Sequence, residues 1–186
     1  KEETVMAKRI ITISREFGSG GRFIGEEVAK KLSIAYYDKE MIGQIAEQAG
    51  LSSEYVRENA ELSPKKGWFA YAFSGRDITG KSVEDMVYEA QRKVIMEIAE
   101  KESCVIIGRN ADFILKDRKD VLNVFIHGSI PEKVRRICSL YNVTEVDAIK
   151  MINDIDKRRR TNYNFYTEQK WGMAENYTMS LNSSVL

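Results

Sequence analysis

The stretch IITISREFGSGGRFIGEEVAKKL, residues 10–32, decides the fold because it joins three different patterns without a break. Its first residues form a short β-branched run, which is typical of a strand buried in a parallel sheet. Small residues follow at 18–21, and the backbone N–H groups of such a turn can point inward because glycine has no Cβ. Apolar residues then recur at helical spacing, as Ile24, Val28 and Leu32. The stretch therefore predicts a strand, a tight turn and a helix in immediate succession.

The turn in this stretch is a candidate phosphate site. Free N–H groups and the positive end of the helix dipole meet where a helix begins, so an anion is stabilised there. The residues expected to bind phosphate in this way are Gly18, Ser19, Gly20, Gly21 and Arg22. A plain strand-turn-helix corner without a ligand is the alternative that spacing alone leaves open.

The turn departs from the usual phosphate-binding pattern, G-x-x-x-x-G-K-[ST], in which the lysine reaches the β and γ phosphates and the hydroxyl reaches Mg²⁺. Here Gly20 is followed by Gly21, Arg22 and Phe23, so the lysine and the hydroxyl are both missing. The guanidinium of Arg22 could restore the lost charge, because it binds phosphate oxygens in a fork. Its alternative role is that of a solvated arginine in the first helical turn.

Outward from this stretch, strand and helix patterns alternate. Four more strands are expected, at 34–37, 105–107, 121–126 and 177–181. Helices are expected at 39–49, from Ser52 to near Pro64, and from Ser82, where S-V-E-D forms a capping box. Two more are expected after Ser129, with S-I-P-E as capping box, and after Thr144, which Asp147 supports. The alternation predicts an α/β fold with a parallel sheet and right-handed crossovers.

One segment fits neither pattern. Residues 63–81, SPKKGWFAYAFSGRDITGK, combine proline, three glycines, aromatic residues and basic residues. A loop of this length is usually functional or mobile. It is either a flexible lobe that covers an acceptor or a partly disordered connector.

The composition describes an ordinary globular protein. The chain has 186 residues, 43% hydrophobic and 31% charged, which fits one domain with a substantial core. A net charge of +1 argues against bulk attraction to nucleic acid or to a membrane surface. Cys104 and Cys138 form neither a metal motif nor a disulfide framework, and no signal or spanning segment is visible, so the expected location is cytoplasmic.

Four separated motifs closely resemble the cytidylate kinase-like family of P-loop nucleoside monophosphate kinases. They are ISREFGSGGRFIGEEVAKKL, YYDKEMI, CVIIGRNAD and DKRRRTNYNFYTEQKWG, in this order along nearly the whole chain. The resemblance implies a single three-layer P-loop kinase domain over 1–186, with a five-stranded parallel sheet. It also implies a helical insertion that binds the monophosphate, at about 38–85, and a lid at about 156–172.

The same resemblance implies a reaction. The γ-phosphoryl group of ATP would pass to a pyrimidine monophosphate, most readily CMP or dCMP, with Mg²⁺ as the metal of ATP chemistry. No protein ligand for Mg²⁺ can be named, because the Ser/Thr of the loop is absent. Two alternatives stay open: a P-loop kinase for another small acceptor, and a catalytically silent nucleotide-binding regulator. Binding of nucleic acid through the run RRR is a weaker third.

Phosphoryl transfer needs positive charge around two phosphate-bearing substrates, so arginines should converge on the centre. The expected catalytic residues are Arg22, Arg109 and Arg159. Arg15 is a further possibility beside the loop. The lone histidine, His127, stands at the end of a strand and is not expected to be catalytic.

Two acidic residues accompany the acceptor motif. In GRNAD, which resembles the family's GRD motif, Arg109 would hold the acceptor phosphate, while Asn110 replaces the acid and Asp112 stands two residues on. Asp112 is either a substrate ligand or a first-turn acid of the segment ADFIL. Asp38 would orient the surroundings of the acceptor phosphate or a water on Mg²⁺, or else cap the helix that begins at Lys39.

The last motif resembles the family's lid, D-K-x-R-x-x-x-Y-x-x-Y-T. It picks out Asp156, Arg159, Tyr163, Tyr166 and Thr167, with Tyr163 as a substrate contact. The run Lys157–Arg160 is interpreted as the end of a helix, where cations favour the dipole even without a function. Trp171 is expected to pack the base of the lid.

Overall fold

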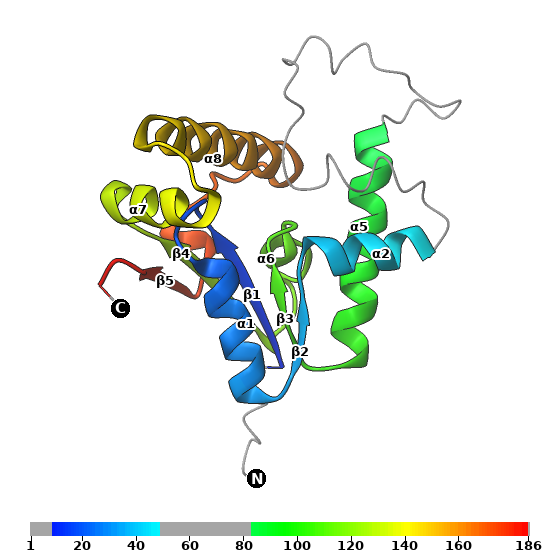
Figure 1. Ribbon diagram of the computed structural model, residues 1–186. Coiled ribbons are helices and arrows are strands. Elements are labelled where there is room, and N and C mark those ends of the chain that lie inside the picture. The colour runs from blue at the N-terminus through cyan, green and yellow to red at the C-terminus, as the bar shows by residue number, and fades with distance from the viewer. Residues whose placement is uncertain (1–8, 49–82, 186) are drawn as a thin grey trace.

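The computed structural model describes residues 9–48 and 83–185 (Figure 1). The helix expected from Ser52, the irregular segment 63–81 and the capping Ser82 lie outside the described residues. Within the described ranges, no helix is both long and apolar enough to cross a membrane.

The core of the molecule is a five-stranded sheet in the order β2-β3-β1-β4-β5. All neighbouring strands are parallel, with Ile10 beside Cys104 on one side and beside Val121 on the other. The strands are β1 (Ile10–Arg15), β2 (Ala35–Tyr37), β3 (Cys104–Ile107), β4 (Val121–His127) and β5 (Met179–Asn182). The prediction of an α/β fold on a five-stranded parallel sheet is confirmed, each strand lying within two residues of its expected bounds.

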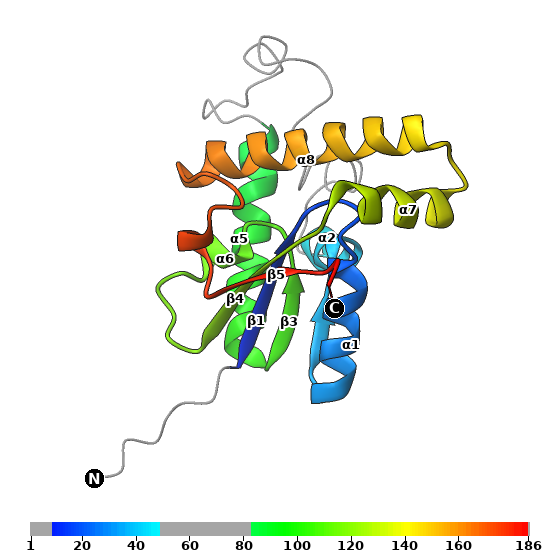
Figure 2. The ribbon, with the colours of Figure 1, turned by 90° about the vertical axis from the view of Figure 1, so that its left-hand side faces the viewer.

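Helices cover both faces of the sheet and its carboxyl edge (Figures 1 and 2). They are α1 (Gly21–Leu32), α2 (Lys39–Gln48), α5 (Val83–Lys101), α6 (Ala111–Ile114), α7 (Ile130–Tyr141) and α8 (Glu145–Thr167), with a 3-10 turn η1 (Ala174–Asn176). In both views α1 lies on one side of the sheet and α5 on the other. The pair α7 and α8 crosses above the ends of the strands.

Alternate residues of the central strands pack against the two helical layers, as the period of a strand requires. Ile10 and Ile106 face α2 and α5, where Ile42 and Ile95 are fully buried. Ile13 and Ile107 face α1, whose Gly25 and Ala29 are buried. The small residues of α1 thus let the helix lie close to the sheet.

A third cluster joins the two helices at the carboxyl edge to the loop after β1. It is built from Val134 and Ile137 of α7 with Ala148 and Ile152 of α8, and Phe17 packs against it. The glycine-rich turn is therefore attached to α7 and α8 through apolar contact as well as through the chain.

The cap predictions have mixed outcomes. Thr144 caps α8 as expected, because its side chain accepts a hydrogen bond from the backbone N–H of Asp147. Ser129 is the N-cap of α7 with proline in the first turn, as expected, but the capping box itself is wrong: the side chain of Ser129 makes no cap hydrogen bond, and its own N–H donates to Ser184 Oγ at 2.8 Å. β5 begins at Met179, two residues later than expected.

The interpretation of Lys157–Arg160 as the end of a helix is also wrong. These residues lie inside α8, which continues to Thr167. The run therefore owes nothing to a helix C-terminus, and its side chains leave the helix at different angles. Arg158 and Arg159 are partly buried, whereas Lys157 and Arg160 are exposed.

Candidate functional site

The loop after β1 lies at the point where the sheet reverses its order. β1 is the central strand, with β3 on one side and β4 on the other, and the carboxyl ends of all three meet at one edge. In open α/β sheets this crevice is where ligands bind.

The loop forms a backbone cup at the start of α1. Gly18 and Gly20 have positive φ angles of 81° and 79°, a conformation that favours glycine, and Gly20 is the N-cap of the helix. Ser19 faces inward, since its N–H and its hydroxyl both donate to the carbonyl of Glu16, at 3.3 and 2.8 Å. Its donors are used within the turn, so the cup offers the N–H groups of the residues from Gly20 onward.

The missing lysine has a steric explanation. A Cβ placed on Gly21 would lie 2.7 Å from Arg15 Cβ, which is closer than real carbon atoms approach. Gly21 is buried at this point, and the aliphatic stem of Arg15 fills the adjoining space. This loop conformation therefore has no room for a lysine at the position after Gly20.

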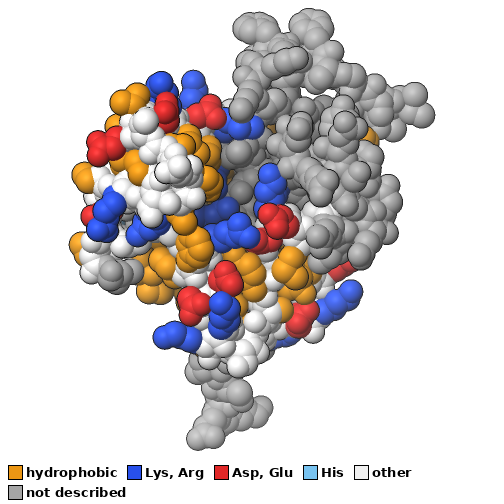
Figure 3. All heavy atoms as spheres, in the orientation of Figure 1, with side chains coloured by type: hydrophobic (Ala, Val, Ile, Leu, Met, Phe, Trp, Pro, Cys, Tyr) orange, Lys and Arg blue, Asp and Glu red, His pale blue; other side chains and the backbone are white. Residues whose placement is uncertain are grey.

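Four arginines from four parts of the chain line one cleft beside the cup. The cleft has a volume of about 480 Å³ and is lined by Arg15, Arg22, Arg136 and Arg159 together with apolar residues of α7 and α8. Figure 3 shows Lys and Arg side chains gathered in the middle of this face, between the α7–α8 pair and α1, with acidic side chains beside them. The arrangement suits a polyanion of several charges.

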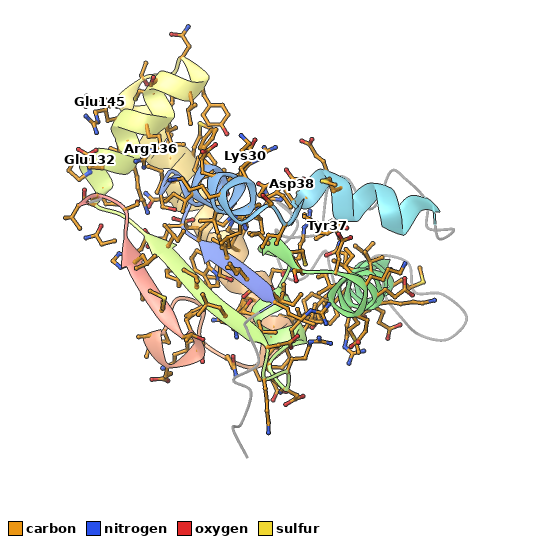
Figure 4. All side chains as sticks on the ribbon, turned by 90° about the horizontal axis from the view of Figure 1, so that it is seen from below. Lys30, Tyr37, Asp38, Glu132, Arg136 and Glu145 are labelled. Atoms are coloured by element: carbon orange, nitrogen blue, oxygen red, sulfur yellow. The ribbon has the colours of Figure 1, made fainter. Side chains whose placement is uncertain are left out.

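Arg136 is the residue of this set that the sequence analysis missed. It lies on α7, and Figure 4 shows it on the other side of α1 from Asp38. Its guanidinium donates to the carbonyl oxygen of Gly18, and its Cζ lies 3.4 Å from where a Cβ of Gly20 would stand. A signal for it existed: the helix that follows the fourth strand begins at the carboxyl edge, so its first turns lie beside the loop.

Arg22 and Asp38 form an ion pair across the mouth of the cleft. Arg22 Nη2 lies 2.8 Å from Asp38 Oδ2, and the side chain of Arg22 is 57% exposed. The other oxygen of Asp38 accepts hydrogen bonds from the N–H groups of Glu40 and Met41. Asp38 thus caps α2, as one of its two expected roles required, and also holds Arg22 at the edge of the cleft.

Arg159 reaches the loop from α8. Its Nη1 donates to the carbonyl oxygen of Arg15 at 3.1 Å and lies 3.8 Å from Asp156 Oδ1. Its guanidinium also lies over the ring of Phe17, 6.0 Å from the centroid. These contacts attach the middle of α8 to the end of β1 and the loop that follows it.

Arg109 lies in a smaller pocket that shares Arg15 and Arg159 with the cleft. Gly108, Arg109 and Asn110 all have positive φ angles, of 67°, 63° and 54°. Such backbone strain in non-glycine residues costs of order 1–3 kcal/mol each and is typical of functional turns. The side chain of Arg109 is buried, and its Nη1 donates to Gln91 Oε1 of α5 at 3.4 Å.

Asp112 and Tyr163 form a buried pair behind this turn. Tyr163 donates to Asp112 Oδ2 at 2.7 Å, and Ser14 donates to Asp112 Oδ1 at 3.2 Å. Burial raises the pKa of Asp112 above its ordinary value, against the two hydrogen bonds, and burial also raises the pKa of Tyr163. Both oxygens of Asp112 are occupied within the protein, so it fixes the end of β1 to α8.

The remaining residues of the lid motif hold α8 in place. Tyr166 stacks in parallel on Tyr88 of α5, with centroids 4.1 Å apart, and Thr167 donates back to the carbonyl of Tyr163. Trp171 meets Phe125 edge to face at 5.3 Å, as a packing residue should.

The described residues contain no group of three or more His, Cys, Asp or Glu side chains that could hold a metal ion. The cup and the arginines fit a polyphosphate, whereas Mg²⁺ gains no protein ligand that can be named from residues 9–48 and 83–185.

Comparison with solved structures places the fold. An uncharacterized protein from Eubacterium ventriosum ATCC 27560 is 28% identical with a TM-score of 0.73, over 95% of this chain and 89% of that one. A shikimate kinase from Bacteroides thetaiotaomicron is 16% identical, with a TM-score of 0.51, over 94% and 85% of the chains. A gluconokinase from Sinorhizobium meliloti 1021 is 13% identical, with a TM-score of 0.52, over 95% and 83%. At such identities the two kinases show a shared fold.

Sequence comparison identifies the family. No curated protein sequence matches the chain. The model of the cytidylate kinase-like family, however, matches residues 10–185, which is nearly the whole chain and includes the cup, Arg109 and Arg159. The chain therefore belongs to the cytidylate kinase-like family and has the α/β fold of P-loop kinases.

Proposed function

We propose that the protein transfers the γ-phosphoryl group of ATP to a pyrimidine nucleoside monophosphate, with CMP or dCMP as the best acceptor. The observation that carries the proposal is the backbone cup at Gly18–Gly21, which opens into a cleft lined by four arginines. Family membership supports a phosphotransferase, and the P-loop kinase fold supports a nucleotide as one substrate.

The donor phosphates would lie in the cup. The N–H groups from Gly20 to Arg22 would donate to phosphate oxygens at the positive end of α1. Arg136 and Arg22 both line the cleft beside the cup, so they would supply the charge that the missing lysine supplies in other loops. ATP brings Mg²⁺ with it, and the metal would neutralise charge on the phosphates.

The acceptor would lie on the Arg109 side. Arg159 lines both the cleft and the smaller pocket, so its guanidinium would lie between the two phosphates. An oxygen of the acceptor phosphate forms the new bond to the γ-phosphorus, the bond from that phosphorus to the bridging oxygen breaks, and ADP leaves with the electron pair. Charge spreads over the transferring group in such a transition state, and Arg159 would stabilise it.

Asp38, Asp112 and Tyr163 enter the proposal as positioning residues. Asp38 holds Arg22, and the pair of Asp112 with Tyr163 holds the strand end from which Arg15 projects. The proposed setting is the cytoplasm, which the free thiols Cys104 and Cys138 favour.

The experiment is an ADP-release assay with ATP and Mg²⁺ across CMP, dCMP, UMP, AMP and GMP. We expect turnover with CMP or dCMP at a kcat/KM at least about tenfold above that with the purines. A small non-nucleotide acceptor set, such as sugars and hydroxy acids, belongs in the same assay. Turnover only with that set would show that the acceptor is not a nucleotide. ATP binding without turnover on any acceptor would reject the proposal that the protein is an enzyme.

A further inference from the structure

We propose that Lys133 of α7 is the positioning residue of the phosphate loop, holding the cup in its binding shape from behind. This inference rests on the proposed function, because it assigns a role within the same donor site. The loop has no room for a lysine at Gly21, yet Lys133 of α7 is buried against the same loop.

Lys133 is buried and doubly paired. Its side chain is 4% exposed, and Nζ lies 3.0 Å from Glu16 Oε2 and 3.2 Å from Asp156 Oδ2. A buried charge is tolerated only when it is paired and hydrogen-bonded. The two carboxylates leave the trio with one net negative charge, which Arg159 Nη1 balances at 3.8 Å from Asp156.

Both carboxylates also hold backbone groups of the site. Asp156 Oδ1 accepts the N–H of Phe17 at 2.7 Å, and Glu16 Oε2 accepts the N–H of Gly128 at 3.2 Å. Glu16 and Phe17 are the two residues that lead into Gly18. The ammonium group of Lys133 therefore neutralises the carboxylates that fix the entry of the cup.

The lysine backbone lies directly behind the loop. A Cβ on Gly18 would lie 3.1 Å from Lys133 Cβ and 3.2 Å from Lys133 O. Of the described residues around the loop, Glu16, Phe17 and Gly18 line the cleft, whereas Lys133 lies behind them and does not. A phosphate in the cup would thus meet the loop and not the ammonium group, so Lys133 acts through the loop.

Stability alone does not account for such a group. Apolar residues of similar volume often replace a buried ion pair without loss of stability, because desolvation offsets the attraction. What apolar residues cannot do is aim two carboxylates at the N–H groups of Phe17 and Gly128. The trio of Glu16, Lys133 and Asp156 specifies the shape of the loop.

The experiment compares Lys133→Met with wild type in the full chain, using two readouts. The first is hydrogen exchange of the amides of residues 17–20 without any nucleotide, and the second is the KM for ATP beside the KM for the acceptor. We expect about tenfold faster exchange at Phe17 and a rise of about tenfold or more in the KM for ATP, because charge-assisted hydrogen bonds are lost. The acceptor KM should change by less than about twofold.

Arg135→Met is the matched control, since Arg135 is exposed on the same helix and pairs with Glu132. It should match wild type in both readouts. Glu16→Gln keeps an acceptor for Gly128 but removes one ion pair, so it serves if Lys133→Met does not fold, and it should give an intermediate change.

The exchange readout separates this inference from the proposed function, because it needs no substrate. If the wild-type protein phosphorylates no acceptor but Lys133→Met still exchanges faster at Phe17, the positioning role of Lys133 is supported and the proposed kinase activity is rejected. Reduced resistance of Lys133→Met to urea, with unchanged exchange at residues 17–20 and unchanged KM for ATP, would overturn the inference, since Lys133 would then stabilise the fold alone.

Discussion

The two sides of the site are built differently. On the cup side, ionised groups hold the loop, and the arginines lie in an open cleft of about 480 Å³. On the Arg109 side, Arg109 is 3% exposed, its side chain donates to the neutral Gln91, and the turn that carries it is strained. In the proposed reaction the donor position would therefore be formed in advance, whereas the buried Arg109 would have to turn outward before an acceptor phosphate could reach it.

Arg159→Ala tests the group that belongs to both sides, and it should have the largest effect. Loss of one donor aimed at transition-state charge typically lowers kcat by about 10²–10³-fold. We expect this loss in kcat with a smaller change in either KM, measured by steady-state kinetics. Arg160→Ala is the control, because Arg160 is exposed and lies over Trp171. Equal kcat in the two variants would show that Arg159 serves neither side.

Arg109→Ala tests the acceptor side alone. A charge-assisted hydrogen bond contributes about 1.5–3 kcal/mol, so the acceptor KM should rise by roughly 10–100-fold. The KM for ATP should stay within about twofold of wild type. A parallel rise in both KM values would show that Arg109 contributes to binding of both substrates, so that the two sides are not separate. Gln91→Leu sharpens the test, because it frees Arg109 from its observed hydrogen bond.

Gly21→Lys tests whether the cup is as tightly formed as its contacts imply. The substitution restores the lysine of the usual loop pattern, yet a Cβ here would lie 2.7 Å from Arg15 Cβ. Overpacking of this kind costs about 1–3 kcal/mol, so we expect lower resistance to urea and weaker ATP binding by calorimetry. Tighter ATP binding in this variant would mean that the loop is more adaptable than the comparison assumes.

Asp112→Asn tests the buried pair with the smallest expected effect. Burial raises the pKa of Asp112 in the folded state, so the stability linked to its proton is present below the unfolded pKa and is lost as pH rises through the folded value. As pH rises from 4 to 7, the wild type should therefore lose stability that the variant does not lose. The free energy of unfolding of the variant should increase relative to that of wild type by about 1.4 kcal/mol per unit of pKa shift. Urea titrations at several pH values measure it. Asp117→Asn, at an exposed site, is the control variant.

The sequence was sufficient for the parts of the molecule that local patterns determine. β-Branched runs such as Ile10–Ile13 located the five strands, and the cap at Thr144 was read correctly. Ser129 begins α7 as predicted, with proline in the first turn, but the capping box is absent because the N–H of Ser129 donates to Ser184 of the final segment and not to Glu132. A local motif cannot report a distant competitor for the same hydrogen bond.

The candidate site was predictable only in part, for a related reason. The cup, Arg22 and Arg159 were predicted, and apart from the buried Ser19 these residues line the cleft. Arg136 and Lys133 were missed because charged residues on an amphipathic helix normally face water. Whether such a side chain turns inward depends on partners from other elements, which are Glu16 and Asp156 for Lys133 and the carbonyl oxygen of Gly18 for Arg136. The run at 157–160 was wrongly predicted to end a helix, because its four charged residues contain no apolar residue that would indicate the continuing buried face of α8.

α8 is one unbroken helix that carries Asp156 beside the cup, Arg159 where the cleft and the smaller pocket meet, and Tyr163 beside Asp112. Each residue of a helix turns the chain by about 100°. An insertion of a single residue between Arg159 and Tyr163 would leave the first half in register and swing Tyr163 about a quarter-turn or more from Asp112. The number of residues between Arg159 and Tyr163 therefore sets the relative positions of the two halves of the candidate site. Substitutions within this stretch should be tolerated far better than insertions or deletions.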